Sequence, residues 1–196
     1  MKVKKLHKDA VLPDRAHDND AGYDLVSVND GEIKVVQTNK NIWRMLYIEY
    51  KTGLAIEPPD GYHIEIVARS SVSKTDLILA NCTAIGDQGY RGEYRLRFKV
   101  PAISYLDMWA ENEEIAVKSF ESKINISGII KYKKGDKIAQ MLIRKTEVMS
   151  IKEVDELSDT IRGEGGFGST DVQEQLNAVA NDPDLILGGG HQFDYK

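Results

Sequence analysis

Cysteine and long apolar runs are both scarce in this chain of 196 residues. Cys82 is the only cysteine, so no intrachain disulfide can form, and a reducing compartment such as the cytoplasm fits the sequence. The longest apolar runs, as at 77–80, are a few residues long and too short to cross a bilayer. The basic first ten residues have no apolar segment behind them and do not match a signal peptide. We therefore expect a soluble intracellular protein.

Positive charge is not in excess either. The chain has 26 Lys and Arg against 31 Asp and Glu, so its formal charge is −5 and its pI is about 5.4. This balance argues against a protein that holds nucleic acid on a broadly basic surface, but a nucleotide needs only a local cationic pocket. No cluster typical of zinc is present, because the histidines are scattered at His7, His17, His63 and His191.

Alternation of polar and apolar residues with a period of two is abundant. Residues 93–100 (EYRLRFKV) alternate strictly, which predicts a half-buried strand, and residues 41–51 are apolar on both faces, like a strand between two layers. Many short strands without intervening helices predict an all-β barrel or sandwich. Further strands, bounded by turns rich in Gly, Pro, Asn and Asp, are predicted at 23–28, 33–37, 53–57, 62–68, 126–132 and 137–143.

Two segments depart from the strand pattern. Residues 103–124 carry apolar side chains at roughly helical spacing, which predicts an insertion with one helix, hung from the sheet. Residues 171–182 place apolar side chains on one helical face, and Pro183 would end that helix. The predicted layout is a barrel domain at 1–160 with an insert at 103–125, a flexible Gly-rich arm at 161–170, and a C-terminal extension at 171–196.

The Gly-rich segment 162–170 (RGEGGFGST) has a composition suited to phosphate. Glycines let backbone N–H groups approach phosphate oxygens, Arg162 supplies a bidentate cation, and Ser169 and Thr170 supply hydroxyls. The segment lacks the Gly-Lys-Ser/Thr ending of a P-loop. A flexible linker is the alternative interpretation, but Phe167 has no core to join there and could lie on a base.

Two shorter segments also carry groups that suit a nucleotide. Residues 68–71 (ARSS) put an arginine and two hydroxyls at the end of a predicted strand, which suits phosphate, although an ordinary polar turn is the alternative. Residues 86–92 (GDQGYRG) form a tight turn before the alternating strand. Asp87 and Tyr90 on that turn could act as a base and a sugar platform; the alternative is a solvated turn aspartate.

These segments occur together in a fixed order. The order is 21–25 (AGYDL), 68–71 (ARSS), 86–92 (GDQGYRG), 135–140 (GDKIAQ) and 162–170 (RGEGGFGST). It resembles the five ordered motifs of the trimeric dUTPase family, the dUTP nucleotidohydrolases, over roughly residues 3–102 and 126–170. The resemblance implies an all-β, jelly-roll-like distorted barrel that assembles as a homotrimer with three composite active sites.

The resemblance also implies a role for each matching residue. Asp87 is expected to be the general base that activates water for attack on the α-phosphorus, and Tyr90 is expected to lie against the deoxyribose. Asp24 is expected to hold, through water, a Mg²⁺ whose other ligands are triphosphate oxygens. The other residues expected to bind substrate are Arg69, Ser70, Ser71, Gln140, Arg162, Gly168, Ser169 and Thr170 around the phosphates, and Asn81 and Phe167 at the base.

The sequence departs from the family pattern in four places. Ala68 stands where proline is common, and 84–87 (AIGD) replaces the usual Gly-x-Ile/Val-Asp, so that a glycine precedes the expected base. The segment between the third and fourth motifs is about twenty residues longer than in short family members. A further 26 residues follow the fifth motif.

The function implied by the resemblance is Mg²⁺-dependent hydrolysis of dUTP to dUMP and diphosphate in the cytoplasm, or in the host cytoplasm for a phage-encoded chain. Neither a membrane nor direct nucleic-acid binding is expected. The position of the insert resembles that in certain phage dUTPases, where an extra segment contacts a repressor protein. A partner-binding regulatory role through residues 103–125 is therefore one alternative. A dCTP deaminase of the same fold is the other, disfavoured by 135–140 and by the Gly-rich segment.

Overall fold

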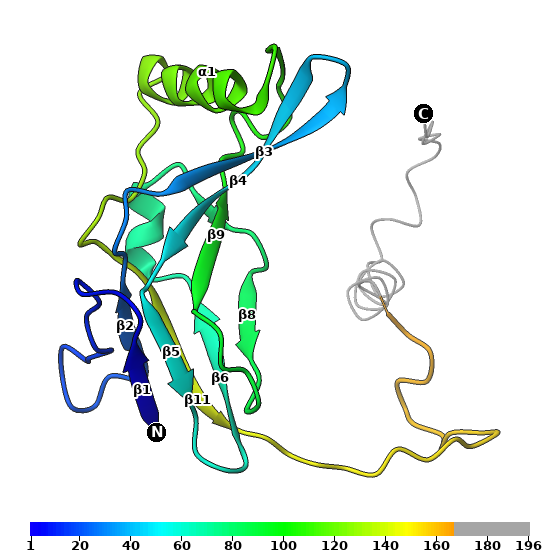
Figure 1. Ribbon diagram of the computed structural model, residues 1–196. Coiled ribbons are helices and arrows are strands. Elements are labelled where there is room, and N and C mark those ends of the chain that lie inside the picture. The colour runs from blue at the N-terminus through cyan, green and yellow to red at the C-terminus, as the bar shows by residue number, and fades with distance from the viewer. Residues whose placement is uncertain (167–196) are drawn as a thin grey trace, which may run out of the picture. The chain divides into compact units, whose positions relative to one another are not determined.

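The computed structural model describes residues 1–166, and the chain divides into two units, Met1–Val148 and Met149–Lys196. In the second unit the described residues contain turns but neither a helix nor a strand. The first unit contains η1 (Ser70–Lys74), α1 (Glu113–Ile126) and the strands β1 (Lys2–Lys5), β2 (Tyr23–Val26), β3 (Glu32–Asn39), β4 (Ile42–Lys51), β5 (Leu54–Glu57), β6 (Tyr62–Val67), β7 (Ile78–Leu79), β8 (Thr83–Gly86), β9 (Arg95–Lys99), β10 (Asp107–Trp109) and β11 (Lys137–Lys145) (Figure 1).

The strands form the jelly-roll-like barrel that the family resemblance implies, and every strand pair that the structure describes is antiparallel. One sheet has the order β2-β11-β6-β8. A second has the order β10-β4-β9-β7, with β3 also pairing with β4, and β1 pairs with β5. None of the described helices is long and apolar enough to cross a membrane.

The two larger sheets face each other across one apolar core. The period of two in β9 buries Leu96 and Phe98 and exposes Arg95, Arg97 and Lys99, so the strict alternation is confirmed. Each sheet contributes fully buried side chains to the same cluster, such as Ile64 from β6 and Ile48 from β4. Burial of these side chains from both layers supplies most of the driving force for folding.

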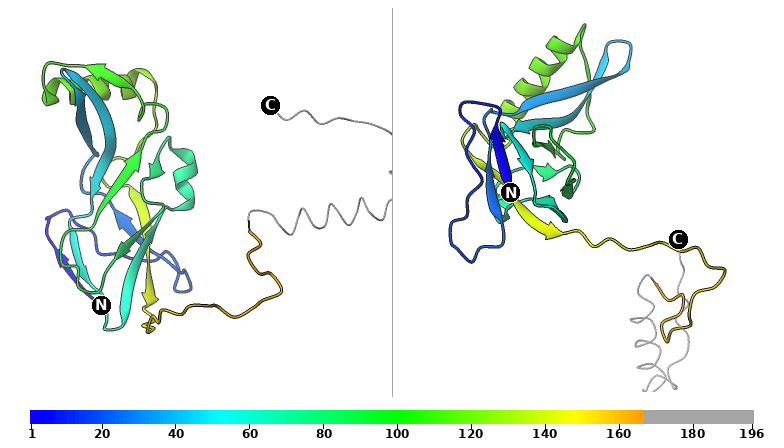
Figure 2. Two further views of the ribbon diagram at one scale, coloured as in Figure 1. Left: turned by 90° about the vertical axis from the view of Figure 1, so that its right-hand side faces the viewer. Right: turned by 60° about the horizontal axis from the view of Figure 1, so that its bottom comes forward.

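The predicted helix in the insert is confirmed as α1. The Asn112 side chain caps it by accepting a hydrogen bond from the Ile115 N–H at 3.0 Å. However, the insert does not merely hang from the sheet, because Phe120 and Ile124 are buried in the main core and β10 pairs with β4. Figures 1 and 2 show α1 lying along the β3–β4 hairpin.

The strand predicted at 126–132 is wrong. Residue 126 is the last residue of α1, and residues 127–136 form neither a helix nor a strand. Gly128 adopts a left-handed conformation (φ 64°), and the Ile129 N–H donates to the Ile124 carbonyl at 3.1 Å. This is the usual way in which a glycine terminates a helix.

Candidate active site

A cavity of about 670 Å³ is lined by residues of β8, β9 and the turn between them, together with Ala80 and Asn81 before β8, Tyr47 of β4 and Ile66 of β6. Three of the predicted site residues line it, namely Asn81, Asp87 and Tyr90. The turn holds the last two in place, since the Tyr90 N–H donates to the Asp87 carbonyl at 3.0 Å and the Tyr90 hydroxyl donates to the Glu93 carbonyl at 3.0 Å. We refer to this space below as the cavity.

The ring of Tyr90 rests on a second tyrosine that the sequence analysis did not identify. Tyr94 packs edge-on against Tyr90 with ring centroids 5.4 Å apart, and it lines the cavity while only 5% exposed. A Cβ atom at Gly86 would lie 2.3 Å from the Tyr94 hydroxyl. Gly86, the departure from the family pattern, is therefore the residue that makes room for the phenol of Tyr94.

A second group of predicted residues meets where β6 ends. Asp24 lies 2.7 Å from Arg69 Nε and 2.7 Å from Lys137 Nζ, and only 13% of its side chain is exposed. Arg69 also donates to the Ser71 hydroxyl at 3.3 Å. Gln140 sits opposite Asp24 in β11. Asp24, Arg69 and Lys137, called the cationic cluster below, carry a net charge of one positive unit and suit an anion.

Lys137 is the member of this cluster that the sequence analysis did not name. It lies inside the fourth motif, three residues before Gln140, and that position was the available signal. The first motif has a glycine at position 22 because a larger residue would collide with the fourth motif: a Cβ there would lie 2.8 Å from Gln140 Oε1. Ser70 begins η1 directly after Arg69.

Asp87 and the cationic cluster lie near opposite ends of β6, although the cavity extends along the strand as far as Ile66. Gly86 pairs with Ile64 near the start of β6, whereas Arg69 follows the end of the strand. Five residues of extended chain separate Ile64 from Arg69, which corresponds to about 16 Å. Neither Arg69 nor Gln140 lines the cavity. The described residues of one chain therefore do not bring Asp87 and the cationic cluster together.

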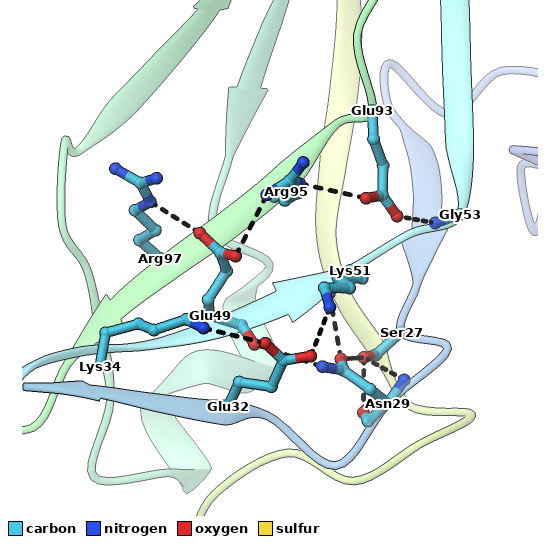
Figure 3. Close-up of polar contacts among 10 residues, drawn as sticks. All are labelled: Ser27, Asn29, Glu32, Lys34, Glu49, Lys51, Gly53, Glu93, Arg95 and Arg97. Atoms are coloured by element: carbon cyan, nitrogen blue, oxygen red, sulfur yellow. Dashed lines mark hydrogen bonds and ion pairs between the residues drawn. The ribbon is translucent and has the colours of Figure 1, made fainter. Parts of the chain in front are cut away.

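Charged side chains also line the cavity on its β9 wall. Glu49 has 4% of its side chain exposed and lies 3.0 Å from Arg97 and 3.5 Å from Arg95 (Figure 3). Arg95 lies 3.1 Å from the carboxylate of Glu93. The guanidinium of Arg97 lies 4.6 Å from the centre of the Tyr47 ring. The charges of these two arginines and two glutamates cancel.

The same network continues to β3. Lys51 forms a hydrogen bond with Glu32, and this bond lowers the pKa of the Glu32 carboxyl below its usual value (Figure 3). Glu93 accepts a hydrogen bond from the Gly53 N–H at 3.0 Å. These contacts fix β9 against its neighbours and keep the wall of the cavity in one arrangement.

The Gly-rich segment is described only at its start. Arg162 is exposed, and its Nε donates to the Gly165 carbonyl at 2.9 Å within a local turn. Four predicted site residues, Phe167, Gly168, Ser169 and Thr170, and the helix predicted at 171–182 lie outside the described residues.

The described residues form no group of three or more His, Cys, Asp or Glu side chains that could hold a metal ion. Each oxygen of the Asp24 carboxylate already faces a cation, Arg69 on one side and Lys137 on the other. A carboxylate oxygen accepts more than one hydrogen bond, so Asp24 fits a role as acceptor for metal-bound water, and it does not fit a direct ligand set.

The family model and the relatives that match this chain all concern one kind of enzyme. A dUTPase family model matches residues 103–171. The deoxyuridine 5′-triphosphate nucleotidohydrolase of Clostridium kluyveri is 37% identical over 169 residues, which cover 86% of this chain and 95% of that protein. The enzyme of the same name from Thermobifida fusca is 36% identical over 176 residues, with 87% and 78% covered.

Solved structures agree with these relatives. The dUTPase of Staphylococcus bacteriophage 80alpha superposes with a TM-score of 0.57 at 27% identity, covering 86% of this chain and 96% of that one. The dUTPase from phage phi11 of S. aureus, described with a species-specific insert, superposes with a TM-score of 0.52 at 26% identity, covering 81% and 98%.

Proposed function

The chain belongs to the dUTPase family, and from this membership we propose that it hydrolyses dUTP to dUMP and diphosphate. One observation carries the proposal: Asn81, Asp87 and Tyr90, expected from the motifs to handle base, chemistry and sugar, line a single cavity. About 670 Å³ is ample for a nucleoside, since small-molecule sites commonly measure 300–1,000 Å³.

In the proposed reaction the Asp87 carboxylate takes a proton from a water molecule. The water oxygen bonds to the α-phosphorus, the bond from that phosphorus to its bridging oxygen breaks, and diphosphate leaves. Tyr90 lies against the deoxyribose and leaves no room for a 2′-hydroxyl. The hydrogen bond from Tyr90 to Glu93 and its packing on Tyr94 support this role, because they fix the ring.

The triphosphate is proposed to bind at the cationic cluster. Arg69 and Lys137 supply positive charge, and Ser70, Ser71 and Gln140 supply polar groups next to it. When bound, Mg²⁺ would neutralise charge on the triphosphate oxygens, which water attack requires. Asp24 would accept hydrogen bonds from the water around that ion. Arg162, Phe167, Gly168, Ser169 and Thr170 are proposed to close over the bound nucleotide.

The site is proposed to be shared between copies in a homotrimer. Asp87 and Arg69 lie at opposite ends of β6, so one nucleotide reaches both only if a second copy supplies one of them. Closed symmetric assemblies repeat such a contact identically in every subunit. Each of three sites would then combine the cavity of one chain with the cationic cluster of its neighbour.

Mixing two impaired variants tests both the activity and the sharing. Asp87→Asn and Arg69→Ala chains are purified separately, then unfolded and refolded together in equal amounts. A shared site takes its base and its cations from different chains, so about one site in four (½ × ½) should be intact, and about a quarter of the wild-type diphosphate release should return.

The outcomes separate the alternatives. If both groups acted from one chain, no mixed site could be intact, and activity would stay at background in trimers verified by native mass spectrometry. Release of ammonia from dCTP by the wild-type protein would instead identify a deaminase. Absence of diphosphate release from dUTP with Mg²⁺ would contradict the proposed function itself.

A second proposed function is contact with a protein partner through the insert. Tyr105 and Trp109 are large side chains of the insert that are 83% and 62% exposed. Exposed aromatic side chains of this kind are common at protein contact sites, where they carry much of the binding energy. The affinity of a candidate repressor should fall at least tenfold for the Tyr105→Ser/Trp109→Ser variant, while dUTP hydrolysis remains unchanged. Equal affinity would contradict this role.

A further inference from the structure

The hydroxyl of Tyr94 is a polar group that the packing leaves without a partner. Tyr94 is 5% exposed, and its oxygen has no hydrogen-bond partner among residues 1–166. Burying a hydroxyl without a hydrogen bond is unfavourable, so native proteins rarely retain one without a reason. The oxygen is itself buried, but Tyr94 lines the cavity, so a bound molecule can supply the missing bond if the phenol shifts toward it.

The position of this hydroxyl is defined by its neighbours. It reaches the point where a Cβ of Gly86 would lie, one residue before Asp87, and its ring contacts Tyr90. Burial is the main factor that raises the pKa of Tyr94, with the nearby charges of Tyr90 and Asp87 adding to it. The phenol therefore stays protonated at neutral pH, when it can both donate and accept a hydrogen bond.

A glycine at position 86 in place of an aliphatic residue changes the chemistry of the cavity. The family pattern has isoleucine or valine where Gly86 stands, and an aliphatic side chain there would present only apolar surface. In this chain the phenol of Tyr94 occupies that space and adds an oxygen. A ligand that bonds to this oxygen binds better than one that does not, because it removes the cost of a buried hydroxyl without a hydrogen bond.

We propose that Tyr94 binds the nucleoside part of the substrate through its hydroxyl, as a hydrogen-bond partner of a base or sugar heteroatom beside Asp87. The inference rests on the proposed function and adds a contact that none of the five motifs contains. Part of the nucleotide affinity is thereby assigned to Tyr94, in addition to the turn that carries Asp87 and Tyr90.

The test is Tyr94→Phe, which removes one oxygen and keeps the ring that packs on Tyr90. We expect the Kd for dUMP and the KM for dUTP to rise about fivefold, as for loss of one net hydrogen bond, with kcat within about twofold of wild type. The Tm should stay equal or rise, because phenylalanine buries no unpaired oxygen.

Tyr50→Phe is the matched control. Tyr50 is also a buried tyrosine, but its hydroxyl donates to the Tyr132 carbonyl at 3.1 Å and it does not line the cavity. This variant should lower the Tm and leave both Kd and KM unchanged. The pair therefore distinguishes loss of a ligand contact from a general loosening of the core.

Each outcome has one meaning. Wild-type Kd and KM in Tyr94→Phe would overturn the inference, and so would a fall in kcat alone, which would assign the hydroxyl to the chemical step. If the wild-type protein neither hydrolyses dUTP nor binds dUMP, the proposed function fails. If it does both while Tyr94→Phe behaves identically, only the inference about Tyr94 fails.

Discussion

The cavity and the cationic cluster are built by different forces. The cavity is shaped by packing and short-range hydrogen bonds within one turn and two strands, with Tyr90 resting on Tyr94 and Tyr94 filling the space above Gly86. In the cationic cluster, by contrast, Asp24 pairs with both Arg69 and Lys137. On the proposed function, the first region is preformed for the nucleoside, whereas the second would have to exchange internal ion pairs for contacts with phosphate.

This difference predicts how the two regions contribute to binding. A preformed cavity binds with little reorganisation, so it supplies specificity at low cost. Ion pairs that are partly exposed respond to salt and to the charge of the ligand. We therefore expect the nucleoside to be recognised similarly in every condition, and the triphosphate to be recognised most strongly at low ionic strength.

The largest expected effect is a loss of turnover without a loss of binding in either region. Asp87→Asn should reduce kcat for dUTP by at least about 10²-fold, the low end for a positioned general base, while the Kd for dUMP stays within a few-fold. Diphosphate release and calorimetric titration measure the two quantities on the same preparation. Near-normal turnover in a folded Asp87→Asn protein would remove Asp87 from the mechanism.

Arg69→Ala should reduce kcat/KM for dUTP by about 10- to 100-fold, because the cationic cluster loses one of its two positive charges. Binding of the uncharged nucleoside deoxyuridine should not change. Arg144→Ala is the matched control, since Arg144 pairs with Glu65 at 3.1 Å and belongs to neither region. Equal losses in the two variants would mean that the effect of Arg69 is not specific to phosphate.

Gly86→Ala tests the packed region. The added Cβ would lie 2.3 Å from the Tyr94 hydroxyl, so the phenol must move, and we expect a loss of about 1–3 kcal/mol in unfolding free energy with weaker dUMP binding. In a Tyr94→Val background the same substitution should cost clearly less. Urea unfolding of the four proteins gives the coupling, and additive effects would contradict the contact between the two residues.

The smallest expected effect is that of salt. Raising NaCl from about 50 to 500 mM should increase the KM for dUTP several-fold, because screening weakens attraction to the cationic cluster. The Kd for deoxyuridine should change less than twofold over the same range. A parallel change in both constants would show that the two regions do not differ in the way described here.

Much of the fold could be predicted because polar and apolar residues alternate in a strand that has one face buried. This holds for β9, whereas in β11 the neighbours Ile138 and Ala139 are both buried, where the register with β2 shifts. β1 and β7 carry no such pattern, since they are strands of four and two residues that form only because a partner strand pairs with them. The strand expected at 126–132 failed because Gly128 stops a helix there.

The candidate site was predictable to the extent that it is local in sequence. Asp87 and Tyr90 belong to one turn, and Arg69 and Ser71 to another, so motifs could group them. The contact between Gly86 and Tyr94 depends on how two sheets approach each other, and no local pattern reports it. The ion pair of Lys137 with Asp24 depends in the same way on the β2–β11 pairing.

β11 is the last strand of the described chain, yet it lies in the interior of its sheet, between β2 and β6. During synthesis on the ribosome, β2 and β6 emerge long before the strand that separates them. Until β11 arrives, both present open edges to other nascent chains, a state that favours aggregation. A translational pause before residue 137 would prolong this exposure, whereas a circularly permuted chain that begins just before β11 would shorten it.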